Sequence, residues 1–208
     1  MKGRPQPAYE KSVFINCPFD QQFQDLLLAI VFAVAAHGLV PRSARETDGS
    51  AEPRFLRILK TLSGSKYSIH DLSRSTGEGV DNLARFNMPL ELGMACALRF
   101  EREKSAQPHH CLILVPDGYS YQTFVSDLSG FDPGRHSQSV ESMIREVSAW
   151  LHLQDDAIEL PPPALQIYQA FASFRSQVSD LRSEALEKEA WTDLLLAASR
   201  TVPRTGEA

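Results

Sequence analysis

The chain has 208 residues, a formal net charge of −5 and 43% hydrophobic residues, a composition that is ordinary for a globular domain. The acidic balance argues against an electrostatic nucleic-acid surface, and no apolar run approaches the ~20 residues needed to span a bilayer. Cys17, Cys96 and Cys111 cannot all pair, and none forms a CxxC motif. We therefore expect a reduced, cytoplasmic protein that binds neither membranes nor nucleic acid directly.

Residues 12 to 70 alternate between short β-branched runs and amphipathic stretches. The run Ser12 to Asn16 predicts a buried strand, and Asp20 occupies the N-cap position of a helix that ends at Gly38. The next predicted elements, in chain order, are a strand at 40–45, a helix from Pro53 to Gly64 and a strand at 66–70.

A long polar loop at 73–86 leads into a second alternating part. The predicted elements there are a helix at 88–100 with Gly93, Ala95 and Ala97 facing the sheet, a strand at 110–115, an unclear segment at 119–136 and a helix at 140–153. Alternating strands and helices predict an α/β fold of the flavodoxin-like (Rossmannoid) type, a mostly parallel sheet with helices on both faces.

Beyond this alternation, proline-rich and amphipathic segments indicate further parts. Runs at 164–178 and 181–198 predict a C-terminal helical pair, which could serve as the surface of a homo-oligomer or bind a partner protein. In chain order, we expect a polar leader at 1–10, the α/β domain at 11–155, a Pro-rich linker at 156–163, a helical extension at 164–200 and a disordered tail at 201–208.

Two carboxylates follow the third predicted strand. Asp71 ends that strand, and Glu91 lies near the start of the next helix. Ligands of open α/β sheets bind outside the carboxyl ends of the strands, so we expect both carboxylates to face one crevice, where chemistry explains them better than folding does. Two structural explanations stay open: Glu91 could favour the helix dipole, and Asp71 could cap a turn.

These motifs resemble a known superfamily. A buried strand that ends in Asp71, the Asn-x-x-x-Glu-Leu-Gly helix start at 87–93 and the Val-Phe-Ile-Asn-Cys-Pro-Phe-Asp sequence at 13–20 are similar to nucleoside 2-deoxyribosyltransferase-like and Toll/interleukin-receptor (TIR)-like proteins. The resemblance covers roughly residues 12 to 153. One position departs from it, because deoxyribosyltransferases usually carry an acid about six residues before the glutamate, where this chain has Arg85.

The resemblance implies cleavage of an N-glycosidic bond. Glu91 would be the catalytic glutamate, and Asp71 would contact the ribose or the base. Bacterial TIR-like proteins cleave the nicotinamide–ribose bond of NAD, often in phage defence, whereas deoxyribosyltransferase-like proteins release or exchange bases. Arg85 in place of the acid argues against base exchange and favours either hydrolysis or a different nucleotide substrate.

Other polar residues near the predicted crevice could bind substrate. We expect Asn87 to position the ribose and Arg74 and Arg85 to bind phosphate, although both arginines could simply be exposed loop charges. Four further candidates each have a structural alternative, namely Asn16 and Asp20 at the first strand's end, which could serve as helix caps, and Tyr119 and Asp127, which could belong to an irregular edge. The sequence contains no metal-ligand spacing, GxGxxG motif or P-loop, so we expect no metal and no cofactor.

The sequence therefore predicts an N-glycosidic bond hydrolase that acts on a nucleotide, with NAD as the first candidate and as a substrate, in a defence or signalling context. One alternative is a non-catalytic, nucleotide-binding or self-associating TIR-like signalling module. Another is a base-releasing glycosidase that acts on (deoxy)nucleotides.

Overall fold

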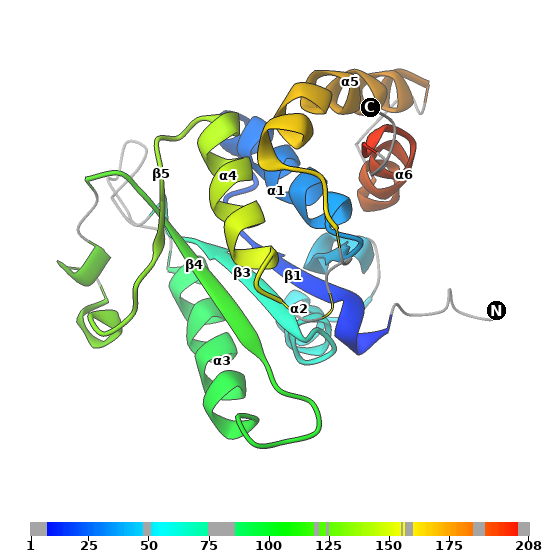
Figure 1. The fold of residues 1–208 in the computed structure, drawn as a ribbon. Coiled ribbons are helices and arrows are strands. Elements are labelled where there is room, and N and C mark those ends of the chain that lie inside the picture. The colour runs from blue at the N-terminus through cyan, green and yellow to red at the C-terminus, as the bar shows by residue number, and fades with distance from the viewer. Residues whose placement is uncertain are drawn as a thin grey trace, which may run out of the picture.

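The centre of the protein is a parallel β-sheet. The computed structural model describes residues 8–47, 51–74, 86–118, 121–123, 125–154, 156, 160–184 and 190–203. Within them the sheet has five strands in the order β2-β1-β3-β4-β5 (Figure 1). These strands are β1 (Ser12–Asn16), β2 (Val40–Arg42), β3 (Tyr67–Asp71), β4 (His110–Pro116) and β5 (Gly134–His136).

Every strand pair in this sheet is parallel, and the order is the flavodoxin-like one. The predicted fold class is therefore confirmed. The register sets Asn16 of β1 beside His70 of β3, and Asp71 beside Leu114 of β4. Since β1 lies between β2 and β3, the strand order reverses at β1, and ligands of such sheets bind at the carboxyl ends next to this point.

Helices cover both faces of the sheet (Figure 1). Helices α1 (Gln24–Ala36) and α4 (Val140–Leu151) cover one face, and α2 (Arg54–Ser63) and α3 (Asn87–Glu101) cover the other. Helices α5 (Ala164–Glu184) and α6 (Trp191–Thr201) form a further layer over α1. Helix α1 is apolar on nearly all sides, because it packs on the sheet and also on α5 and α6.

The C-terminal helices share the core of the α/β domain. Phe174 of α5 stacks on Phe32 of α1 with ring centroids 4.5 Å apart, and the Trp191 indole of α6 donates a hydrogen bond to the Pro41 carbonyl at 3.1 Å. The apolar residues that suggested a partner surface are thus largely used within the chain, as the buried Ile167, Phe171, Phe174, Val178, Leu194 and Ala197 show.

Most predicted elements are present, with three differences. The second C-terminal helix begins at Trp191, since residues 181–184 continue α5. Residues 119–136 include the strand β5, which sequence patterning did not indicate. Gly93 and Ala97 are exposed, and the side of α3 that faces the sheet instead carries Met88, Leu92 and Ala95, because positions three or four apart share a helix face.

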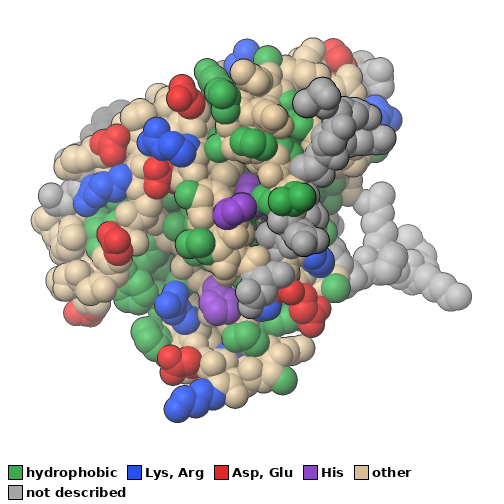
Figure 2. All heavy atoms as spheres, viewed as in Figure 1, with side chains coloured by type: hydrophobic (Ala, Val, Ile, Leu, Met, Phe, Trp, Pro, Cys, Tyr) green, Lys and Arg blue, Asp and Glu red, His purple; other side chains and the backbone are tan. Residues whose placement is uncertain are grey.

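Surface charge and helix length were the two features used above to exclude nucleic-acid and membrane binding. On the face drawn in Figure 2, basic and acidic side chains are interspersed, so no surface of a single charge forms there. None of the described helices combines the length and apolar character needed to cross a bilayer.

Candidate functional site

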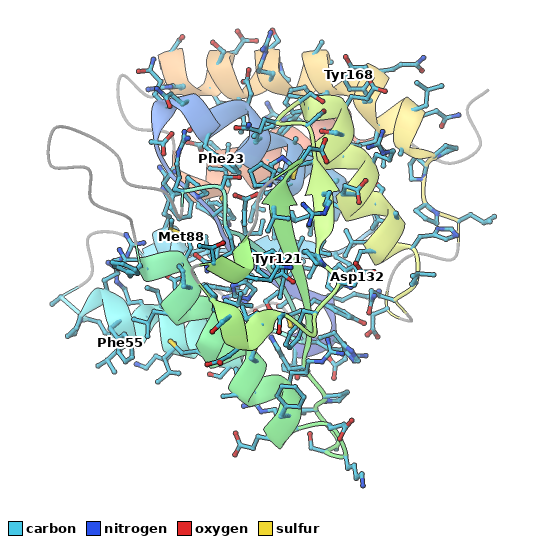
Figure 3. The ribbon with its side chains drawn as sticks, turned by 90° about the vertical axis from the view of Figure 1, so that its left-hand side faces the viewer. Phe23, Phe55, Met88, Tyr121, Asp132 and Tyr168 are labelled. Carbon is cyan, nitrogen blue, oxygen red and sulfur yellow. The ribbon has the colours of Figure 1, made fainter. Side chains whose placement is uncertain are left out.

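A small cleft opens between the first turns of α2 and α3, at the carboxyl edge of the sheet. Figure 3 shows these turns side by side, marked by Phe55 on α2 and Met88 on α3. The cleft has a volume of about 170 Å³. Its described lining consists of Arg54, Phe55, Ile58, Asn87, Leu90 and Glu91.

Glu91 is the acid of this cleft, and its side chain is only 7% exposed. Burial raises the pKa of Glu91 from 4.5 to about 7, and the positive charge of Arg54 opposes this rise. No described residue donates a hydrogen bond to the carboxylate. With a pKa of about 7 this acid is partly protonated at neutral pH, and a ligand that brings positive charge or hydrogen-bond donors would favour its ionised form.

The start of α3 is fixed to the sheet through Asn16. This buried side chain uses Nδ2 to donate hydrogen bonds to the Met88 carbonyl and to Nδ1 of His70, each at 3.0 Å. Because the Met88 carbonyl can only accept, the amide orientation is determined, and His70 must accept at Nδ1. Asn16 therefore positions the first turn of α3 and does not line the cleft.

The hydrogen bonds continue from His70 beneath the helices. Nε2 of His70 donates to the Ser68 hydroxyl, the hydroxyl donates to Nε2 of His109, and Nδ1 of His109 donates to the Ser65 carbonyl, each at 2.9 Å. Both histidines are neutral in this arrangement. Burial agrees with it, because it lowers the pKa of His70 to about 3 and that of His109 to about 4.

Asp71 is fully buried on the other face of the sheet. Side chains alternate along a strand, so Asp71 shares the side of Ile69, toward α1 and α4. Its carboxylate accepts hydrogen bonds from Nε2 of His136 and from the Ser73 amide, both at 2.9 Å. Nδ1 of His136 accepts from the Gln138 amide at 3.3 Å. The structure therefore does not bring Asp71 and Glu91 into one cleft.

Two predicted binding residues contact each other. The Arg74 guanidinium donates to both carboxylate oxygens of Asp20 at 3.2 Å and to the Gln22 side chain at 3.0 Å. Asp20 also accepts from the Phe23 amide at 3.0 Å, as expected of an N-cap.

Of the remaining predicted site residues, one lines the cleft and the others do not lie there or fall outside the described residues. Asn87 lines the cleft with Glu91, whereas Asp127 is exposed on a short 3-10 turn. Arg85 and Tyr119 lie outside the described residues. Within the described ranges, no group of His, Cys, Asp or Glu side chains is placed to hold a metal ion.

Sequence reasoning missed four lining residues of the cleft, Arg54, Phe55, Ile58 and Leu90. The available signal was the helix start at Pro53. In a parallel α/β fold every helix that follows a strand begins at the carboxyl edge, so the first turn of α2 belongs beside that of α3. The partner of Asp71, His136, had no such signal, because it belongs to a strand that the sequence does not reveal.

Comparison with known proteins adds little to this description. No family model matches the chain, and no curated protein matches it. Among solved structures, it is similar to the TIR domains of the activated Roq1 resistosome, described as directly recognizing the pathogen effector XopQ, at 9% identity over 78% of this chain and 97% of that chain, with a TM-score of 0.37. The class of the protein, a flavodoxin-like α/β protein with a carboxylate cleft, rests on its own strand order and site.

Proposed function

We propose that the protein is an N-glycosidic bond hydrolase acting on a nucleotide, with NAD as the first candidate substrate and Glu91 as the catalytic carboxylate. The observation that carries this proposal is Glu91 itself. Its carboxyl group is buried, has a pKa raised to about 7 and faces a cleft at the carboxyl edge of the sheet. Burying a carboxyl group lowers the stability of the fold, and binding a ligand is a physical reason to retain it at this position.

Glycosidic cleavage needs a carboxylate of this kind. Positive charge develops at the anomeric carbon in the transition state, and a carboxylate held in a water-poor site stabilises that charge or forms a bond to it. In turn, the positive charge that develops on the substrate lowers the pKa of Glu91 and so favours its ionised form.

The separation of Asp71 from the cleft favours NAD over an ordinary nucleoside. A purine or pyrimidine base leaves more easily when a second acid protonates it, but the described lining of the cleft contains no second carboxyl group. Nicotinamide attached to ribose already carries a positive charge, so it departs as a neutral molecule without protonation. One carboxylate is therefore sufficient for this bond.

The other lining residues suit the rest of a nucleotide. Arg54 and the first turns of α2 and α3 supply positive charge for a phosphate, Asn87 can hydrogen-bond the ribose, and Phe55 offers a ring for stacking. In this proposal Arg54 takes the phosphate role expected of Arg74, whose guanidinium contacts Asp20 and Gln22. The cleft is smaller than the roughly 300–1,000 Å³ of small-molecule sites, so it would hold the ribose and its leaving group.

The test is mass spectrometry of free bases released from NAD, ribonucleotides and deoxynucleotides. Wild-type protein should release nicotinamide from NAD, and Glu91→Gln should lower the rate by about 10³-fold, the scale of losing a principal stabilising group. Glu103→Gln, which removes an exposed carboxylate just beyond α3, is the matched control and should retain the wild-type rate. Release that survives Glu91→Gln, or release of other bases only, would refute this assignment.

A second candidate, a self-associating module, is favoured by one observation. Apolar side chains of the cleft lining on α2 and α3 are exposed, with Phe55 52% and Leu90 56% exposed, and Phe86, the residue before α3, is 73% exposed. Leu56 and Leu59 of α2 are exposed as well. An apolar patch of this kind is typical of an interaction surface. Silence in the base-release assay, together with concentration-dependent assembly, would favour this candidate over the hydrolase.

A further inference from the structure

The first half of strand β4 has an open edge. Strand β5 pairs with β4 only from Leu114 onward, and within the described residues no other strand lies on that side of β4. The chain before β5 turns back on itself, as the hydrogen bond from the Phe131 amide to the Leu128 carbonyl at 3.0 Å shows. The edge of β4 at residues 111–113 is therefore left without a neighbouring strand.

The pairing with β3 shows which backbone groups of β4 point to the open side. The Leu114 carbonyl accepts a hydrogen bond from the Leu72 amide at 2.9 Å, so the backbone of Leu114 points toward β3. Because these groups alternate in direction along a strand, those of Cys111 and Ile113 point away from β3. In the part of the chain that the structure describes, neither the N–H and C=O of Cys111 nor the N–H of Ile113 has a hydrogen-bond partner.

A cavity of about 510 Å³ lies along this open edge. Residues 111–113 form its floor, and its lining includes Arg99 and Phe100 from the end of α3 and Trp150 from the end of α4. Asp132, labelled in Figure 3, lines the end that lies toward β5. The volume is within the roughly 300–1,000 Å³ of ligand sites. Backbone groups in such a cavity can hydrogen-bond to water or to a ligand.

An extended peptide is the ligand that matches these backbone groups. Donors and acceptors spaced along a strand edge are complementary to the C=O and N–H groups of another strand. A segment of three to four extended residues is about 10–13 Å long, which is the scale of the open edge at residues 111–113. Such a segment would lie in line with β5 and would continue the sheet along the whole of β4.

The two walls of the cavity indicate which side chains this peptide carries. Residues at the same level of neighbouring strands point to the same face of a sheet. Leu112 belongs to the core on the side of α4, whereas Cys111 belongs to the cluster beneath α3. The peptide residue opposite Leu112 therefore points toward Trp150, where an apolar side chain can pack. The residues on either side of it point toward Arg99, whose guanidinium can pair with a carboxylate.

We propose that the open edge of β4 binds an extended segment of a partner protein by strand addition, and that apolar and acidic residues alternate in this segment. Its backbone hydrogen-bonds to Cys111 and Ile113. Its apolar side chain packs on Trp150, and its acidic side chain pairs with Arg99. The cavity at this edge shares no lining residue with the cleft of Glu91, so the interaction does not require the proposed hydrolase activity.

The experiment measures fluorescence polarisation of two fluorescein-labelled probes with the full-length protein, one peptide of alternating Val and Glu and one of alternating Val and Lys. We expect saturable binding of the Val-Glu peptide and at least about tenfold weaker binding of the Val-Lys peptide, because its charges would face Arg99. Methylation of the backbone nitrogens of the Val-Glu peptide should abolish binding, since it removes the donors that strand addition needs. Hydrogen exchange at the Cys111 and Ile113 amides should slow when the Val-Glu peptide is bound.

Three variants locate the binding site. Arg99→Glu should weaken binding of the Val-Glu peptide by about tenfold or more. Arg145→Glu makes the same change of charge at an exposed position of α4 outside the cavity and should bind as the wild type does. Glu91→Gln should also bind normally, which separates this result from the test of the hydrolase. The proposal is overturned if neither probe saturates, if the methylated or the Val-Lys peptide binds as tightly as the Val-Glu peptide, or if Arg145→Glu loses as much affinity as Arg99→Glu.

Discussion

The two faces of the sheet are built differently. On the side of α1 and α4, the strand residues are mainly apolar, including Val13, Ile15 and Ile69, and α5 and α6 add a second layer that buries most of α1. On the side of α2 and α3, the strands present Asn16 and His70 among smaller apolar clusters. That side has one layer of helices, and apolar residues on them remain in water.

The larger apolar core and the candidate cleft therefore lie on opposite faces of the sheet. The doubly covered face has the larger continuous core, and apolar burial is the main favourable contribution to folding. The singly covered face holds the neutral histidines and the buried Glu91, each of which costs stability unless it is hydrogen-bonded. The buried polar groups of the candidate cleft therefore lie beside a larger apolar core that can offset their cost.

The largest expected effect comes from opening the doubly covered face. Phe174→Ala removes a fully buried ring that stacks on Phe32 and should lower the free energy of unfolding by about 3–5 kcal/mol. Urea denaturation monitored by circular dichroism measures this loss. Leu165→Ala, at an exposed position of the same helix, is the control and should change stability by no more than about 0.5 kcal/mol. Similar losses in both variants would show that α5 is not part of the core.

A smaller effect, of opposite sign, is expected at Glu91. Its pKa is raised from 4.5 in the reference state to about 7, so the folded protein keeps a proton that the unfolded chain releases as the pH rises through this window. Wild-type stability therefore falls across the window, by at most about 3 kcal/mol. Glu91→Gln lacks this penalty.

The prediction is that Glu91→Gln and wild type have similar unfolding free energies near pH 4.5, and that the variant becomes the more stable protein as the pH approaches about 8. Denaturant titrations over this range measure the difference, and Glu103→Gln controls for the loss of one negative charge. A difference that does not change with pH would mean that the Glu91 carboxyl group is not buried as described.

The next largest effect on stability is expected from removing the hydrogen bonds of Asn16. Asn16→Ala leaves the Met88 carbonyl and Nδ1 of His70 without their donor, and the cost should be about 1–3 kcal/mol. Asn87→Ala, an exposed site at the start of α3, serves as the comparison and should cost clearly less. Equal costs would indicate that water replaces the lost amide, and that Asn16 does not position α3.

Local sequence signals predicted much of this fold. The β-branched runs bounded by Pro and Gly placed β1, β3 and β4 to within about two residues, which is the usual boundary error. Asp20 was predicted as an N-cap, and its hydrogen bond to the Phe23 amide confirms that. Strand β5 was missed because it has three residues, one of them Gly134. It forms through pairing with β4 and through the bond from His136 to Asp71, and both are contacts distant in sequence.

The candidate site was predicted in part, for a similar reason. The position of Glu91 at the carboxyl edge follows from chain order alone. Chain order alone does not show on which face of the sheet each carboxylate lies. Asp71 and Glu91 belong to opposite faces, because Asp71 points from β3 toward α1 and α4 whereas Glu91 is on α3. Sequence spacing therefore brought together two carboxylates that the fold separates, and it left out Arg54, which the fold supplies from α2.

The smallest effect on stability should come from the exposed apolar surface of α2 and α3. The double variant Phe55→Ser, Leu90→Ser removes side chains that are already half in water, so the free energy of unfolding should change by no more than about 0.5 kcal/mol. If this surface mediates self-association, light scattering at increasing protein concentration should show assembly of the wild type and a monomeric double variant. A variant that is strongly destabilised would instead place these side chains in the core, and assembly that persists in a stable variant would locate the interface elsewhere. In that last case, binding of a ligand in the cleft would be the remaining explanation for these exposed apolar side chains.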